Sequence, residues 1–180
     1  MSALRLVLAG IVVLVAVDRA SAQDAQVTAT ARGLELRTEA YRAEFTNQGL
    51  EFSPANTNEL FSFRLHRIEA GGTALVGASN RSQEPESIDG GAVRYSLTPE
   101  TTEIYEPRPN GIEQLFRFAQ PLPAGADLRI IGRFTSKHRP IRARGAGAAF
   151  ATEDGIAVTT YGEPTLIDSN GRAISGRLEL

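Results

Sequence analysis

The chain has 180 residues, and removal of a 22-residue leader would leave 158, the size of one ordinary domain. It contains no cysteine, which excludes a disulfide framework, thiolate metal sites and a cysteine nucleophile. The formal net charge is −2. Nucleic acids and anionic lipids select a basic excess, so we expect no nucleic-acid partner.

The first 22 residues have the three parts of an export signal. Arg5 precedes an uncharged run over residues 6–17, and Ala20-Ser21-Ala22 forms a small-x-small cleavage site. The run is shorter than the ~20 residues that a membrane-spanning helix needs. We therefore predict cleavage between Ala22 and Gln23 and a secreted, extracytoplasmic protein without an integral membrane span. The alternative is an uncleaved N-terminal anchor.

Most of the mature chain alternates apolar and polar residues with a period of two, which is typical of half-buried strands. The segments with strand character are residues 41–45, 50–52, 61–66, 73–76, 93–97, 116–118, 128–134, 156–161, 165–168 and 172–180. The run 46–49 and the pair Asn170-Gly171 favour hairpin turns. Residues 128–134 are more continuously apolar, which indicates a more fully buried strand.

No segment repeats apolar residues with helical spacing for three turns. We predict an all-β fold, an antiparallel β-sandwich of about ten short strands, with a closed meander as the alternative. In domain terms, residues 23–32 are a lead-in and residues 33–180 a single domain. Residues 177–180 end the chain in alternating strand sequence, so either the last strand ends the domain or the natural polypeptide continues beyond Leu180. We favour the second alternative, because an orphaned strand edge is prone to pairing.

The sequence has no catalytic or metal-binding motif. His66 and His138 have no carboxylate at a metal-ligand spacing, and we expect both to be structural or solvent-exposed. No Gly-x-Ser-x-Gly elbow occurs. We therefore expect no metal, no cofactor and no enzymatic activity.

Four carboxylates lie close together in sequence, at Glu100, Glu103, Glu106 and Glu113. Two carboxylates across a glycosidic bond hydrolyse glycans, so a glycan-binding or glycoside-hydrolysing domain is the alternative function. The absence of tryptophan speaks against an aromatic sugar platform.

A basic segment follows residue 136. Its fixed positive charges are Lys137, Arg139, Arg142 and Arg144. They form a candidate polyanion patch, although a solvated edge or loop is the favoured interpretation because the chain is net negative.

Residues 105–116, Tyr-Glu-Pro-Arg-Pro-Asn-Gly-Ile-Glu-Gln-Leu-Phe, resemble a segment of an N-terminal β-rich module of bacterial exported proteins. In those proteins the module precedes FG-GAP, β-propeller-type or other surface repeat arrays. The likeness continues, in the same order, in residues 33–35 with 41–45, 155–158 with 161–162, and 168–180. Pro107 and Leu115 depart from the pattern, which has Asn and Gly at these places.

The resemblance implies a non-enzymatic, secreted or cell-surface structural or interaction module with no catalytic residues to carry over. Its partners would be further domains of the same polypeptide or cell-envelope components. The residues that carry the motif are Tyr105, Arg108, Gly111, Glu113, Gln114 and Phe116. We expect Glu113 and Gln114 to tie the turn at residues 107–111 to a neighbouring strand through buried hydrogen bonds.

Overall fold

The computed structural model describes residues 6–10, 26–55, 57–77, 84–123, 125–142 and 147–180. Over these residues the fold is all-β, with antiparallel sheets, one short 3-10 turn (η3, Asp89–Gly91) and no α-helix. This confirms the predicted fold class. The described residues form seventeen strands, more than the ten or so expected, and those missing from the expected set include both short edge strands and the central eight-residue strand at residues 101–108.

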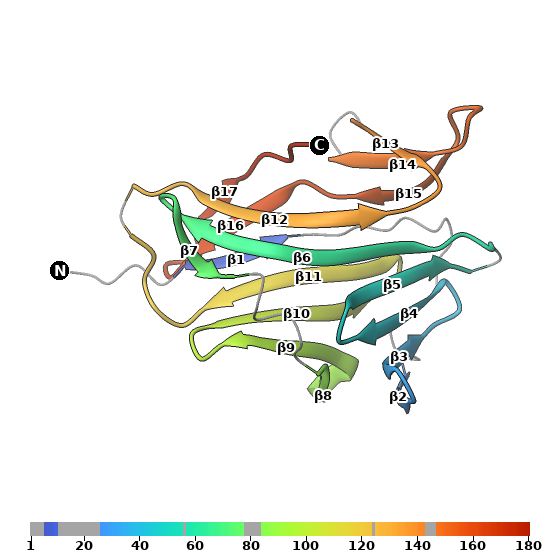
Figure 1. The fold of residues 1–180 in the computed structure, drawn as a ribbon, viewed down its shortest axis with the longest axis horizontal. Coiled ribbons are helices and arrows are strands. Elements are labelled where there is room, and N and C mark those ends of the chain that lie inside the picture. Colours follow the sequence, from blue (N-terminus) through green and yellow to red (C-terminus); the bar gives the residue numbers. More distant parts are fainter. Residues whose placement is uncertain (1–5, 11–25, 56, 78–83, 124, 143–146) are drawn as a thin grey trace.

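The first sheet has the strand order β17-β16-β1-β11-β10-β9-β8. Its strands, in chain order, are β1 (Leu6–Gly10), β8 (Glu86–Ile88), β9 (Ala92–Thr98), β10 (Thr101–Arg108), β11 (Gly111–Phe118), β16 (Pro164–Asp168) and β17 (Ala173–Ser175). The long central strands β9, β10 and β11 form a meander (Figure 1). The turn at Asn170-Gly171 joins β16 to β17, as predicted.

The second sheet has the order β12-β6-β5-β4-β3-β2, and β7 also pairs with β6. Its strands are β2 (Gln26–Thr30), β3 (Gly33–Arg37), β4 (Tyr41–Thr46), β5 (Gly49–Pro54), β6 (Phe61–Ala70), β7 (Thr73–Val76) and β12 (Leu128–Thr135). The predicted hairpin is the β4–β5 pair, closed where Thr46 faces Gly49. Strand β2 lies within residues 23–32, the segment that we expected to be a lead-in to the domain.

A third, smaller sheet has the order β13-β14-β15, with β13 (Arg139–Arg142), β14 (Ala148–Ala151) and β15 (Ala157–Tyr161). Phe150 of β14 is buried and packs edge-on against Phe61 of β6, with ring centroids 5.5 Å apart. Phe134 of β12 meets Tyr161 of β15 at 4.7 Å. Aromatic contacts therefore fix the third sheet to the large core.

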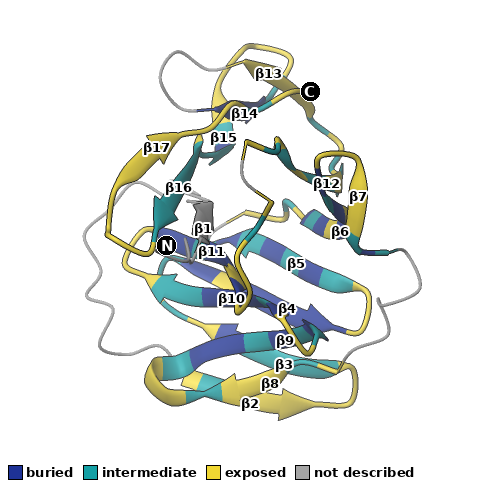
Figure 2. Ribbon diagram, turned by 90° about the vertical axis from the view of Figure 1, so that its left-hand side faces the viewer, coloured by how far each residue is buried: buried dark blue, intermediate teal, exposed yellow. Residues whose placement is uncertain are grey.

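The main core lies between the first and second sheets. Figure 2 shows burial concentrated in β4, β5, β9, β10 and β11, whereas β2, β13 and β17 are mostly exposed. Alternation explains this, because Phe61, Phe63 and Leu65 of β6 point inward while the residues between them point out. The two-residue period of the sequence thus corresponds to the inner and outer faces of the sheets.

The expectation that residues 128–134 form a more fully buried strand than the others is wrong. Strand β12 is the terminal strand of the second sheet, and Arg129, Gly132 and Arg133 are exposed while Ile130 and Phe134 are partly buried against the core. An edge strand with one solvated face needs only alternate apolar residues. The isoleucines at 130 and 131 fall on opposite faces, because Ile131 lines the outer surface.

The expected leader includes β1, whose backbone pairs with β11 on one side and β16 on the other. The predicted cleavage residues Ala22 and Gln23 lie outside the described residues. In the part of the chain that is described, no helix has the length and apolar character needed to cross a membrane.

Candidate functional site

A polar quartet lies inside the sandwich, formed by Glu103 and Tyr105 of β10, Gln114 of β11 and Tyr161 of β15. The Tyr105 hydroxyl donates to Glu103 Oε1 at 2.6 Å, and Gln114 Nε2 donates to the same oxygen at 2.5 Å. Tyr161 in turn donates to Gln114 Oε1 at 2.7 Å. Gln114 is therefore the hub that connects two sheets.

Burial changes the acid–base properties of this quartet. Desolvation raises the pKa of Glu103 from 4.5 to about 7, although the bonds from Tyr105 and Gln114 act in the opposite direction. Burial likewise raises the pKa of Tyr105 and Tyr161 above their usual range, and the Glu103 charge adds to the effect. Glu103 is thus a buried carboxyl that titrates near neutrality, a property found often at functional sites.

The space next to Glu103 is small. A cavity of about 40 Å³ lies between the β4–β5 turn, β6 and the β9–β10 pair, with Gln48, Arg64, Tyr95 and Glu103 in its lining. Sites for small-molecule ligands usually measure ~300 Å³ or more, whereas a water needs only ~10–15 Å³. The cavity therefore fits a few water molecules and is too small for a sugar ring.

The other three carboxylates of the predicted acidic group do not converge on Glu103. Glu106 and Glu113 are cross-strand partners on the outer face, and both contact Arg108: Glu113 Oε2 lies 2.7 Å from Arg108 Nε, and Glu106 Oε2 lies 2.7 Å from the guanidinium. Hydrogen bonding to Glu113 raises the pKa of Arg108. Glu100 is exposed in the β9–β10 turn. No two of these carboxylates face each other across an open cleft.

The residues of the proposed sequence motif divide between core and surface. Tyr105, Gln114 and Phe116 are buried, whereas Arg108 and Gly111 form the end of the β10–β11 hairpin. Gly111 has a φ of 154°, which suits glycine at this turn. Glu113 was expected to make buried hydrogen bonds together with Gln114. Successive strand residues point to opposite faces, so Glu113 instead makes an ion pair on the outer surface.

The predicted polyanion patch does not present four free charges. Lys137 forms an ion pair with Glu59 at 2.7 Å, and His138, stacked on Phe61, contacts the other oxygen of Glu59 at 2.9 Å. The Lys137 hydrogen bond lowers the pKa of Glu59. Arg142 donates to the backbone oxygen of Leu178, and Arg139 is exposed on β13.

Arg144, the fourth residue of that patch, lies outside the described residues. Elsewhere, no cluster of three or more potential metal ligands exists among the side chains that the structure describes. His66 lies on β6 and lines the outer surface.

A larger hollow lies on the outer face of the second sheet. This groove has a volume of about 600 Å³ and is lined by outward residues of β5, β6 and β12 and by the β4–β5 turn, including Gln48, Glu51, Ser62, Arg64, Arg133 and Thr135. Arg64 and Arg133 are direct cross-strand partners. Sequence alternation places both side chains on a solvent face, but it contains no signal that β6 and β12 are neighbours.

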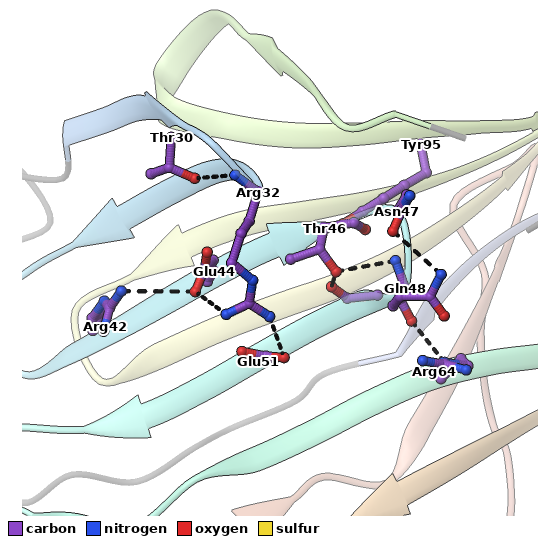
Figure 3. Close-up of polar contacts among 11 residues, drawn as sticks. Thr30, Arg32, Arg42, Glu44, Thr46, Asn47, Gln48, Glu51, Arg64 and Tyr95 are labelled. Atoms are coloured by element: carbon purple, nitrogen blue, oxygen red, sulfur yellow. Dashed lines mark hydrogen bonds and ion pairs between the residues drawn. The ribbon is translucent and has the colours of Figure 1, made fainter. Parts of the chain in front are cut away.

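Beside the groove, the outer face of β3, β4 and β5 carries a ladder of alternating charges. Arg32 bridges Glu44 and Glu51 at 3.0 and 2.8 Å, as Figure 3 shows. Arg42 contacts both Glu35 and Glu44. Acidic and basic groups are thus balanced over these three strands.

Comparison of the chain with protein-family models, with curated proteins and with solved structures gives no match. The resemblance to the N-terminal module of exported repeat proteins therefore stays a prediction.

Proposed function

We propose that this chain is an exported, non-enzymatic interaction module, as the resemblance in residues 105–116 implies. The observation that carries the proposal is that the carboxylates near this segment are engaged by neighbouring side chains and do not form a catalytic pair. Glu103 is bound inside the sandwich by Tyr105 and Gln114, and Glu106 and Glu113 share Arg108. A glycosidase needs two carboxyl groups on either side of a bound sugar, which these positions do not provide.

Glu103 is the one group that favours the alternative of glycan hydrolysis, because a carboxyl with a pKa of about 7 suits a general acid. Its cavity of about 40 Å³ holds no sugar, however, and within the described lining Glu103 is the only carboxylate. A raised pKa is equally the consequence of burial in a structural network. The interaction module is therefore the better supported function.

The experiment combines export and activity. The full chain is expressed in a bacterial host with a C-terminal tag, and the product is located by fractionation and sequenced from its N-terminus. We expect an extracytoplasmic product that begins at Gln23. Incubation with a panel of neutral and acidic polysaccharides is expected to release no reducing ends.

Release of reducing ends by the wild type, and its loss in Glu103→Gln, would establish the glycosidase alternative. A product that keeps its first 22 residues and stays in the cytosol would overturn the exported part of the proposal. The surface variant Glu106→Gln serves as the matched control, because it removes a carboxylate without touching the buried quartet.

A further inference from the structure

The groove over β6 and β12 is lined by two arginines, Arg64 and Arg133, and by one carboxylate, Glu51. Arg64 and Arg133 are cross-strand partners on the outer face, so their backbones lie side by side, and the Arg64 side chain extends from there to the β4–β5 turn. Directly opposed like charges destabilise a sheet. Such a pair is favourable when an anion lies between the two guanidinium groups.

The nearby carboxylates are already engaged elsewhere. Glu51, the acidic residue in the groove lining, forms its ion pair with Arg32, and Glu69 forms one with Arg67. Over the described residues, neither Arg64 nor Arg133 forms an ion pair. The charged residues of β3–β5 are therefore paired with one another or with Arg32, whereas Arg64 on β6 and Arg133 on β12 have no acidic partner among the described residues.

The Arg64 guanidinium is held in place. Its Nε donates to the backbone oxygen of Gln48 at 3.0 Å, a bond drawn in Figure 3. This anchors one edge of the planar group and leaves its terminal nitrogens available to a ligand. An arginine fixed in this way loses less side-chain entropy on binding than a free one.

The groove also offers neutral hydrogen-bonding groups. Ser62 and Thr135 are also cross-strand partners in the lining, each two residues along its strand from an arginine of the pair. Gln48 lies at the β4–β5 turn. A volume of about 600 Å³ is in the range of sites for small-molecule ligands. The lining thus combines two cations with hydroxyl and amide groups.

We propose that this groove binds a linear acidic polysaccharide, with a uronate carboxylate or a sulfate bridging Arg64 and Arg133 and with sugar hydroxyls bonded by Ser62, Thr135 and Gln48. The proposal deepens the function proposed above, because it names the ligand of the interaction module. The sheet contributes few cations and one carboxylate to the lining, and its aromatic residue Phe63 is buried. Nucleic acid, which selects many cations and exposed stacking rings, fits this surface less well.

Binding is tested on the full chain of the wild type, Arg64→Gln, Arg133→Gln and the double variant, with polygalacturonate and alginate oligomers as acidic probes and a sulfated glycan as a third. Calorimetry is expected to show saturable binding that weakens as salt rises. Each single variant is expected to weaken it about ten-fold or more, since each removes one charge-assisted hydrogen-bonding group. Neutral oligosaccharides of equal length are expected not to bind.

The matched control is Arg172→Gln, which removes an exposed arginine from the β16–β17 turn of the first sheet, outside the groove lining, and is expected to leave the affinity unchanged. Folding of every variant is checked by circular dichroism and urea unfolding. Equal affinity in the wild type and the folded double variant would overturn the proposal. So would tighter binding of single-stranded DNA than of any acidic glycan, or a loss of binding in Arg172→Gln equal to that in the groove variants.

The same samples are assayed for released reducing ends. Glycan release would contradict the non-enzymatic function whatever the groove binds. Absence of binding with no release would refute the groove proposal alone.

Discussion

Gln114 donates its side-chain amide to Oε1 of Glu103 across the β10–β11 pair, and both side chains lie inside the sandwich. A carboxyl in such a position is stable only with hydrogen-bonding partners, because burial penalises its charged form. The two residues are thus coupled, since Gln114 supplies one of the bonds that offset the desolvation of Glu103.

The raised pKa of Glu103 makes stability depend on pH. The folded state binds the Glu103 proton more tightly than the unfolded chain does. Ionisation of Glu103 therefore destabilises the folded state, and this loss of stability is absent below pH 4.5, grows as pH rises and is complete above about pH 7. A shift of this size corresponds to about 3 kcal/mol. We expect Glu103→Gln to be more stable than the wild type at pH 8 by up to this amount, and nearly equal to it at pH 4.5.

The measurement is urea unfolding of both proteins between pH 4.5 and 8. Comparing the difference between the two chains removes the contribution of other titrating groups, such as Glu59, whose pKa is lowered. A stability difference that does not change with pH would show that Glu103 is ionised with an ordinary pKa.

Removal of Gln114 is expected to destabilise the fold strongly. Gln114→Leu fills a similar volume but leaves Glu103, Tyr105 and Tyr161 each without one hydrogen-bond partner, which we expect to cost about 3 kcal/mol. Tyr161→Phe leaves a single amide oxygen unpaired and is expected to cost about 1–2 kcal/mol. Equilibrium unfolding at pH 6 measures both variants. Wild-type stability in Gln114→Leu would mean that the quartet contributes no net free energy.

Of the quartet, the sequence predicts buried hydrogen bonds only for Gln114, and it predicts them to the turn at residues 107–111 and not to Glu103. Alternation places Ile112, Gln114 and Phe116 on one face of a strand, and the apolar neighbours identify that face as the inner one. The β10–β11 hairpin joins two strands that are adjacent in the sequence, so the position of its turn places Tyr105 opposite Gln114. Tyr161 could not be predicted, because it joins from another sheet.

The groove is harder to predict for the same reason. Strands β6 and β12 are separated in the chain by β7–β11, and their pairing depends on the tertiary fold. Local patterns give the outward direction of Arg64 and Arg133 but not that they are neighbours. The apolar stretch at 128–134 pointed to a buried strand because periodicity alone does not reveal a bulge, and the register of β12 shifts between Ile131 and Gly132.

Gly132 is needed for close packing of Phe63. A Cβ at this position would lie 2.2 Å from Cε2 of the Phe63 ring, and that ring is confined by Phe134 at 5.0 Å and Tyr161 at 6.2 Å. We expect Gly132→Ala to destabilise the protein by about 1–3 kcal/mol through overpacking. Urea unfolding of Gly132→Ala, Phe63→Leu and the double variant gives the coupling between the two sites. Because leucine vacates the space, the glycine substitution should cost less in the Phe63→Leu background, and additive costs would contradict a steric origin.

The predicted export cleavage would remove β1 from the first sheet. β1 pairs along its length with β11, where Val7 faces Arg117, and with β16, where Val7 faces Ile167. Without β1, the facing backbone groups of β11 and β16 lose their partners, and unpaired strand edges accept another strand readily.

We expect amide hydrogens of β11 and β16 to exchange faster in a chain of residues 23–180 than in the full chain, as measured by mass spectrometry. The β4–β5 hairpin pairs with neither and serves as the internal control. A synthetic peptide of residues 4–12 should restore protection, whereas full protection in the shorter chain without peptide would mean that β11 and β16 close the gap by pairing with each other.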